Sequence, residues 1–163
     1  MANVARRRFS DKLGGAPHSK QALRLWLRLL SCSIIVEKRI RVRLDEDFGT
    51  TLPRFDVLAA LERHSQGLTN AQLSASLMVS SGNVSGVVTR LIRDGLLTRK
   101  VDADDRRSAT VRLTRKGRAS FLKLASVHER WVDQMFSDLT DLEVTGLMKL
   151  LNALRRSIED HPI

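Results

Sequence analysis

One helical face between Ser81 and Arg93 carries small polar, glycine and arginine residues. Hydroxyl, amide and guanidinium groups of this kind can exchange hydrogen bonds with DNA base edges or phosphates. Glycine on the same face would let the backbone approach another surface closely. The candidates for these contacts are Ser81, Gly82, Asn83, Ser85, Gly86, Thr89 and Arg90. An ordinary solvated helix face has a similar composition, so this face alone leaves both interpretations open.

A charged hairpin follows this helix, with its tip at DADDRRS. Residues 99–118 hold eight cations against three anions. A projecting cationic hairpin suits the narrow, electronegative minor groove of DNA. We expect Arg106 and Arg107 to contact DNA, and Asp102 or Asp105 to pair with an arginine and brace the hairpin. A charge-mixed surface turn is the alternative.

Hydrophobic periodicity predicts the elements that position these groups. Helices are expected over 19–44, 53–64, 70–77, 81–94, 115–138 and 141–159, with strands at 68–69, 96–101 and 109–114. Thr69 and Gln72 have the spacing of a capping box, and Ser80 or Ser81 should cap the next helix. Gly95 stands where a left-handed residue ends a helix, and Thr114 should cap the fifth helix.

The expected fold is mainly α with a small β-wing, a winged helix-turn-helix. We expect a mobile basic tail at 1–18 and a single domain at 19–163. Within it, 53–114 forms the DNA-binding lobe. The helices at 19–44 and 115–160 are apolar on more than one side, which predicts a dimerisation region as well as a core.

Composition narrows the class of partner. The net charge of +10 favours a polyanion, either nucleic acid or an anionic membrane surface. There is no Tyr and only 4% aromatic residues, which argues against stacking on single-stranded nucleic acid. The N-terminus lacks an apolar signal region and no run is long enough to span a bilayer, so we expect a cytoplasmic protein without membrane contact.

The stretch LTNAQLSASLMVSSGNVSGVVTRLIRDGLLTRK, followed by DADDRRSATVRLTRKGR, resembles the MarR family of bacterial winged-helix regulators. The resemblance extends over roughly 24–158. The family's wing pattern is Asp-x-Arg-Asp-x-Arg, which Asp102, Asp105 and Arg107 match. Asp104 departs from it, standing where the family often has Arg, so Arg106 becomes our candidate for the minor groove.

The resemblance implies a homodimer on a pseudo-palindromic operator of double-stranded DNA. Such proteins usually repress, and a small molecule bound between the dimer helices and the DNA-binding lobe releases them. TLPRFDVLAALER and SSGNVSGVVTRL also resemble a branch associated with aromatic-acid degradation, including regulators that answer to aromatic acyl-CoA thioesters. The candidate ligand-binding residues are Trp26, Phe55, His128 and Trp131, each of which could instead be core or dimer packing.

Other functions find less support. Cys32 raises a redox-sensing alternative, but it lies between serines and we expect a structural, buried cysteine. The four histidines are scattered without ligand spacing, so no metal is expected. There is no phosphate-cradling loop or nucleophile elbow, so we expect neither an enzyme nor a cofactor. A non-specific architectural DNA-binding protein is the alternative that charge alone allows.

Overall fold

The computed structural model describes residues 17–101 and 109–161. The chain divides after Leu52 into two units, and each is described by itself. The expected wing-tip residues Asp102, Asp105, Arg106 and Arg107 lie outside the described residues, as does the expected tail up to residue 16.

The first unit holds α1 (Pro17–Phe48), which is longer than the expected 19–44. The predicted end of this helix at residue 44 is wrong, because the helix continues to Phe48. No helix breaker occurs until Gly49, which adopts a left-handed φ of 55°. There the amide of Gly49 donates to the Asp45 carbonyl at 2.9 Å, and the next amide to the Leu44 carbonyl at 3.1 Å.

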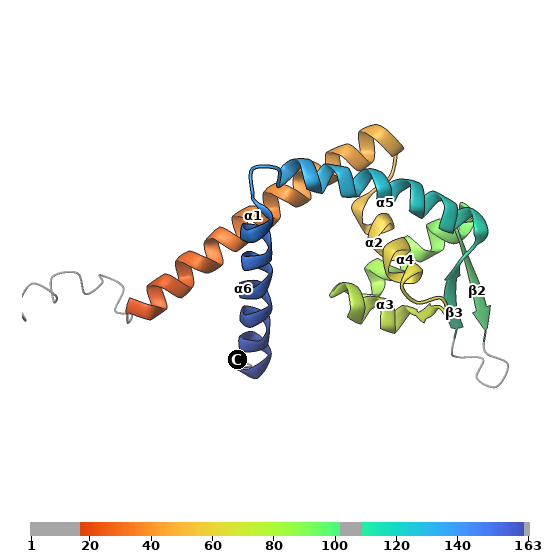
Figure 1. Cartoon of the computed structure of the whole chain (residues 1–163). Coiled ribbons are helices and arrows are strands. Elements are labelled where there is room, and N and C mark those ends of the chain that lie inside the picture. The colour runs from red at the N-terminus through yellow and green to blue at the C-terminus, as the bar shows by residue number, and fades with distance from the viewer. Residues whose placement is uncertain (1–16, 102–108, 162–163) are drawn as a thin grey trace, which may run out of the picture. The chain divides into compact units, whose positions relative to one another are not determined.

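The second unit begins with α2 and contains the helix-turn-helix, the sheet and two long helices (Figure 1). Its elements are α2 (Leu52–Glu62), β1 (Leu68–Thr69), α3 (Asn70–Leu77), α4 (Ser81–Arg93), β2 (Leu97–Val101), β3 (Ala109–Leu113), α5 (Arg115–Met135) and α6 (Asp141–Asp160). The mainly helical fold with a small β-wing is therefore confirmed. In the described part of the chain no helix is long and apolar enough to cross a membrane.

The sheet has three antiparallel strands in the order β1-β3-β2, so the predicted short strand at 68–69 pairs with the predicted hairpin. The short β1 joins it because Leu68 pairs with Val111 on β3. Gly67 makes this approach possible: with φ at 85°, its Cβ would lie 2.6 Å from the Val111 carbonyl oxygen and from Cγ of Arg112. Only glycine fits there.

The core of the second unit forms where the predicted apolar stripes meet. Helical periodicity predicts a buried stripe of Val84, Val87 or Val88, Leu91 and Ile92 on α4. Val84, Val88 and Leu91 are buried, whereas Ile92 is half-buried. Leu73 of α3 and Val111 of β3 are also buried. Together they hold one side of α4 against the lobe, so its opposite side stays exposed.

Two helices leave much of their apolar surface uncovered. On α1 the exposed apolar residues include Leu23, Leu25, Trp26, Leu27, Leu30, Ile34, Ile35 and Val42. On α6 they are Leu142, Leu147, Met148, Leu150, Leu151 and Ile158. No described residue of α6 is buried. Apolar surface on this scale marks a site of association.

Candidate nucleic-acid interface

The start of α3 is fixed by a capping box, as predicted. The Thr69 hydroxyl accepts a hydrogen bond from the Gln72 amide at 3.2 Å, and the Gln72 side chain accepts one from the Thr69 amide at 2.8 Å. Both bonds satisfy amides that the helix itself leaves without an acceptor. This places the first helix of the helix-turn-helix directly after β1.

The turn between α3 and α4 is closed by a Schellman pair of hydrogen bonds. The Met78 amide donates to the Ala75 carbonyl at 3.3 Å, and the Val79 amide to the Ser74 carbonyl at 3.1 Å. Ser74 adds a bond from its hydroxyl to the Val79 carbonyl, and the Ser81 hydroxyl lies 3.4 Å from that of Ser74. The turn therefore sets the direction in which α4 leaves α3.

A side-chain bond joins the two helices along their length. Asn70 donates from Nδ2 to the Ser85 hydroxyl at 3.1 Å, and Ser85 is half-buried. Thr89 uses its hydroxyl as a donor to the Ser85 carbonyl at 2.8 Å. The Ser85 hydroxyl thus bridges α3 and α4, a role that sequence reasoning missed because the two residues are 15 positions apart.

Most of the predicted contact residues share the exposed side of α4. They are Ser81, Gly82, Asn83, Gly86, Thr89 and Arg90. A Cβ built on Gly82 or Gly86 meets no atom of the described chain within 4 Å. Glycine inside a helix costs about 0.5–1 kcal/mol relative to alanine. The fold of the described chain does not require either glycine, so their small size favours contact with an external surface.

The N-terminus of α4 differs from the other capped helices. Thr69, Thr114 and Thr140 each accept a backbone hydrogen bond at the start of their helices. Ser80 is the N-cap of α4, as expected, but its side chain makes no capping hydrogen bond in the described structure. The first-turn amides of α4 therefore lack a side-chain acceptor here, and a helix N-terminus in this state suits a phosphate.

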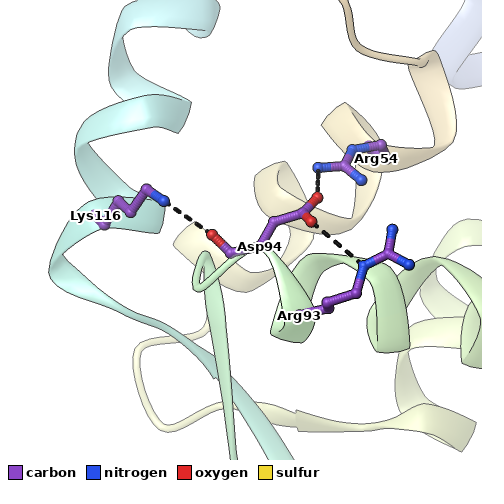
Figure 2. A network of polar contacts seen from close by, with 4 residues as sticks. All are labelled: Arg54, Arg93, Asp94 and Lys116. Atoms are coloured by element: carbon purple, nitrogen blue, oxygen red, sulfur yellow. Dashed lines mark hydrogen bonds and ion pairs between the residues drawn. The ribbon is translucent and has the colours of Figure 1, made fainter.

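The other end of α4 is anchored through Asp94, which Figure 2 shows among Arg54, Arg93 and Lys116. Arg54 of α2 donates to Oδ2 of Asp94 at 2.6 Å, and Arg93 lies 3.7 Å from Oδ1. Lys116 of α5 donates to the Asp94 carbonyl at 2.9 Å. The bond from Arg54 is the main reason that the pKa of Asp94 lies below its ordinary value. Asp94 thus links the C-terminus of α4 to both α2 and α5.

The predicted left-handed Gly95 is confirmed, with φ at 72°. Its amide donates to the Ile92 carbonyl and that of Leu96 to the Leu91 carbonyl, both at 2.9 Å. This second Schellman pair turns the chain from α4 into β2.

The beginning of α5 packs against the same corner. Thr114, its predicted cap, accepts from the Gly117 amide at 2.9 Å and has its hydroxyl 2.8 Å from the Gly95 carbonyl. A Cβ on Gly117 would lie 1.9 Å from the Leu96 carbonyl oxygen, so no larger residue fits without backbone movement. This close packing fixes the position of the first turn of α5, which carries the exposed cations Arg115 and Lys116.

The described part of the wing keeps its basic character. Arg99 and Lys100 on β2 are exposed, whereas Arg112 on β3 is half-buried and its Nη2 lies 3.4 Å from the Gln66 side chain. Arg118 is less available for a contact with DNA than Arg99 and Lys100, because it pairs with Glu62 of α2 at 2.9 Å. Arg106 and Arg107, with the bracing candidates Asp102 and Asp105, remain predictions.

Two of the four candidate ligand residues lie in contact. The rings of Phe55 on α2 and His128 on α5 stack with centroids 4.7 Å apart, and Phe121 lies 5.8 Å from Phe55. Burial lowers the pKa of His128. Trp131 is buried, and Trp26 is exposed on α1 in the other unit. The Phe55–His128 pair is the part of the expected site that the structure brings together.

Cys32 is exposed on α1, contrary to the expectation of a buried cysteine. Its apolar neighbours along the helix, Leu30 and Ile34, are exposed as well. Among the described residues no group of three or more His, Cys, Asp or Glu side chains could hold a metal ion.

Comparison with known proteins matches these features to one family. A family model described as the MarR family matches residues 48–108. The transcriptional activatory protein BadR of Rhodopseudomonas palustris is 31% identical over 160 residues, covering 94% of this chain and 91% of its own. The uncharacterized HTH-type transcriptional regulator YkoM of Bacillus subtilis is 34% identical, covering 68% and 71%.

Solved structures agree on the fold. A MarR family transcriptional regulator from Silicibacter pomeroyi superposes with a TM-score of 0.75 at 28% identity, covering 88% of this chain and 99% of that one. The transcriptional regulator BldR from Sulfolobus solfataricus gives a TM-score of 0.78 at 24% identity, covering 88% and 100%.

Proposed function

Because the chain belongs to the MarR family of DNA-binding transcriptional regulators, we propose that it acts as a homodimeric repressor. In this proposal it binds a pseudo-palindromic operator, and a small aromatic acid or aromatic acyl-CoA thioester releases it. The exposed side of α4 is the single feature that carries the proposal. Its two glycines are unnecessary to the fold of the described chain, and its polar groups surround them.

On the operator, α4 would enter the major groove with Gly82 and Gly86 nearest the bases. Asn83 and Arg90 carry the amide and guanidinium groups that read adenine and guanine edges. The first-turn amides would donate hydrogen bonds to the oxygens of a backbone phosphate. Arg106 would reach the minor groove from the wing, with Arg107 beside it and Asp102 or Asp105 bracing the hairpin.

The dimer would be built from the apolar residues that α1 and α6 leave exposed. Two-fold symmetry requires the same surface on both copies, and a self-complementary apolar face satisfies it. The dimer would set the distance between its two α4 helices, which must lie about 34 Å apart to meet successive major grooves. Cys32 would be covered in this interface, which accounts for its exposure in the single chain.

An effector at the Phe55–His128 pair would act on α4 through α2. Phe55 stacks on His128, and its neighbour Arg54 holds Asp94 at the end of α4. A ligand that moves the start of α2 would therefore change the anchorage of α4. It shifts the population away from the DNA-bound state by no more than its differential affinity for the two states.

The direction of regulation depends on where the operator lies. BadR is named an activatory protein, whereas our proposal is repression, in which the operator overlaps the promoter. Transcription in vitro from a recovered promoter separates the two outcomes, because added protein lowers the transcript if it represses and raises it if it activates.

The test is selection of bound genomic fragments, followed by measurement of specific against non-specific affinity. We expect specific binding at least 1,000-fold tighter than binding to unrelated DNA, as is typical of regulators. Arg90→Ala should weaken specific binding by about tenfold or more, since a base contact contributes about 1–3 kcal/mol. Lys123→Ala, which removes an exposed cation from α5, is the matched control. Equal affinity for all sequences would instead indicate an architectural DNA-binding protein.

A second experiment measures release of the protein from the same operator by a panel of aromatic acids and their acyl-CoA thioesters. We expect at least one member to release the protein at micromolar concentration, and Phe55→Ala to weaken that response. Release of the variant and wild type at the same concentrations would move the effector site away from Phe55.

A further inference from the structure

Met78, in the turn between α3 and α4, has a backbone conformation that its side chain makes costly. It is the one non-glycine residue with positive φ in the described ranges 17–101 and 109–161, at 53°. Left-handed backbone brings the Cβ of an L-residue close to its carbonyl oxygen, a penalty that glycine does not incur. The Schellman bonds of the turn explain why the backbone is left-handed. They do not explain why the residue is methionine.

The Met78 side chain contributes almost nothing to the interior of its own chain. It is 91% exposed, which is more than any other exposed large hydrophobic residue in the described parts. Val79, next to it, is 43% exposed. A left-handed residue whose large apolar side chain faces solvent points to a contact outside the chain, because such strained positions cluster at ligand contacts.

The neighbouring groups identify the partner. Ser81, Gly82 and Asn83 are exposed within five residues of Met78, and the first-turn amides of α4 have no side-chain cap in the described structure. The bonds from Ser74 to Val79 and from Ser81 to Ser74 tie the turn to this end of α4. The apolar pair therefore adjoins the end of α4 that suits a phosphate.

We propose that Met78, with Val79, packs against the apolar surface of the operator beside the phosphate held by the α4 amides. That surface is the deoxyribose or the 5-methyl group of thymine, the apolar groups that DNA presents at its backbone and in the major groove. Methionine suits it because the thioether chain is flexible and polarisable. This inference rests on the proposed function, since it adds an apolar contact to the same DNA-binding surface.

The test compares Met78→Gly and Met78→Asn with the wild-type dimer. Both replacements tolerate left-handed backbone, and both remove the apolar side chain. Met78→Gly should raise the Tm by about 2–4 °C, as expected for relief of the left-handed strain in a chain of this size. Both variants should bind the operator about tenfold more weakly, whereas Met78→Leu should retain most of the affinity.

Opposite changes in stability and binding are what distinguish a DNA contact from a folding role. Leu122→Gln, which removes an exposed apolar residue from α5, is the control and should leave operator affinity unchanged. A more stable Met78→Gly with wild-type operator affinity would overturn the inference. It would leave the proposed function intact, provided the wild type still prefers the operator over unrelated DNA. A wild type without that preference would overturn both.

A second set of binding measurements identifies which apolar group of the DNA Met78 contacts. Operator DNA with deoxyuridine in place of thymine lacks the 5-methyl groups. If wild type loses affinity on this DNA and Met78→Gly does not, the contact is the thymine methyl. If the difference between the two proteins is the same on both DNAs, the contact is the deoxyribose. A Met78→Gly protein that equals wild type on both DNAs overturns the contact altogether.

Discussion

The exposed sides of α4 and α6 differ in chemistry although both belong to the second unit. On α4 the exposed residues are small or polar, among them Gly82, Asn83 and Arg90. On α6 they are large and apolar, among them Leu142 and Leu150. This difference is what the proposed function requires, since a hydrogen-bonding polyanion would contact the first surface and another apolar face the second.

The glycines also differ in whether the fold or an external partner accounts for them. Gly67 and Gly117 are required internally, because a Cβ would meet backbone atoms at 2.6 Å and 1.9 Å. Around Gly86 on α4 and Gly146 on α6, a Cβ would meet no atom of the described chain within 4 Å. For a glycine without a left-handed φ, the space around it therefore indicates whether the fold of the described chain requires it.

The largest effect is expected from Leu150→Asp on α6. Burying one leucine contributes about 1.5 kcal/mol or more, and a two-fold interface contains the residue twice. The proposed dimer should therefore dissociate roughly 100-fold more readily. Sedimentation at micromolar concentration measures this directly. The monomer should remain folded, because Leu150 is 70% exposed in the single chain.

The matched control is Asn152→Asp, which adds the same charge to α6 at an exposed polar position. It should leave the dimer intact. Dissociation in both variants would mean that charge alone, rather than a lost apolar contact, separates the subunits. A Leu150→Asp protein that stays dimeric would remove this part of α6 from the interface.

A pair of alanine substitutions tests the glycine contrast. Gly117→Ala should destabilise the fold by about 1–3 kcal/mol, because the Leu96 carbonyl must move. Gly86→Ala should stabilise it by about 0.5–1 kcal/mol and weaken operator binding. Thermal unfolding and operator titration check both. If Gly86→Ala improved stability and binding together, close approach of α4 to DNA would not explain the glycine.

The smallest effect concerns pH and the half-buried ring of His128 on α5. Burial holds the pKa of His128 below its ordinary value of 6.5, so the folded state favours the neutral ring. As pH falls through about 6.5 the unfolded chain takes up the proton first, and stability decreases until the folded pKa is passed. Thermal unfolding at pH 7.5 and 5.5 should show this loss. His128→Phe keeps an aromatic ring beside Phe55 and should reduce it.

Local features of the fold were predictable from the sequence. Thr69 with Gln72, Thr114 and Gly95 were each identified from chemistry within a few residues, and each prediction is confirmed. Helical periodicity also predicted most of the buried stripe on α4, since Val84, Val88 and Leu91 are buried and only Ile92 is half-buried. Such features depend on neighbours along the chain, so a single sequence carries them.

Long-range polar contacts were not predictable. Arg54 and Asp94 are 40 positions apart and Lys116 lies 22 beyond Asp94, so no local period connects them. The pairing of β1 with β3 could not be predicted for the same reason, since Leu68 and Val111 meet only in the folded sheet. At the candidate DNA-binding site, sequence identified the exposed residues but missed the bonds through Asn70 and Asp94 that position them.

The corner formed by Thr114, Gly117 and Leu96 couples the long helix α5 to the sheet. The close approach of Gly117 to the Leu96 carbonyl and the bond from Thr114 to the Gly95 carbonyl hold the first turn of α5 against the corner. A helix of 21 residues is then a rigid arm of about 30 Å. Rotating the corner by about 5° would displace the far end of that arm by roughly 3 Å. Conversely, a displacement of that size at the far end would become a small rotation of the sheet and of the helix that precedes it.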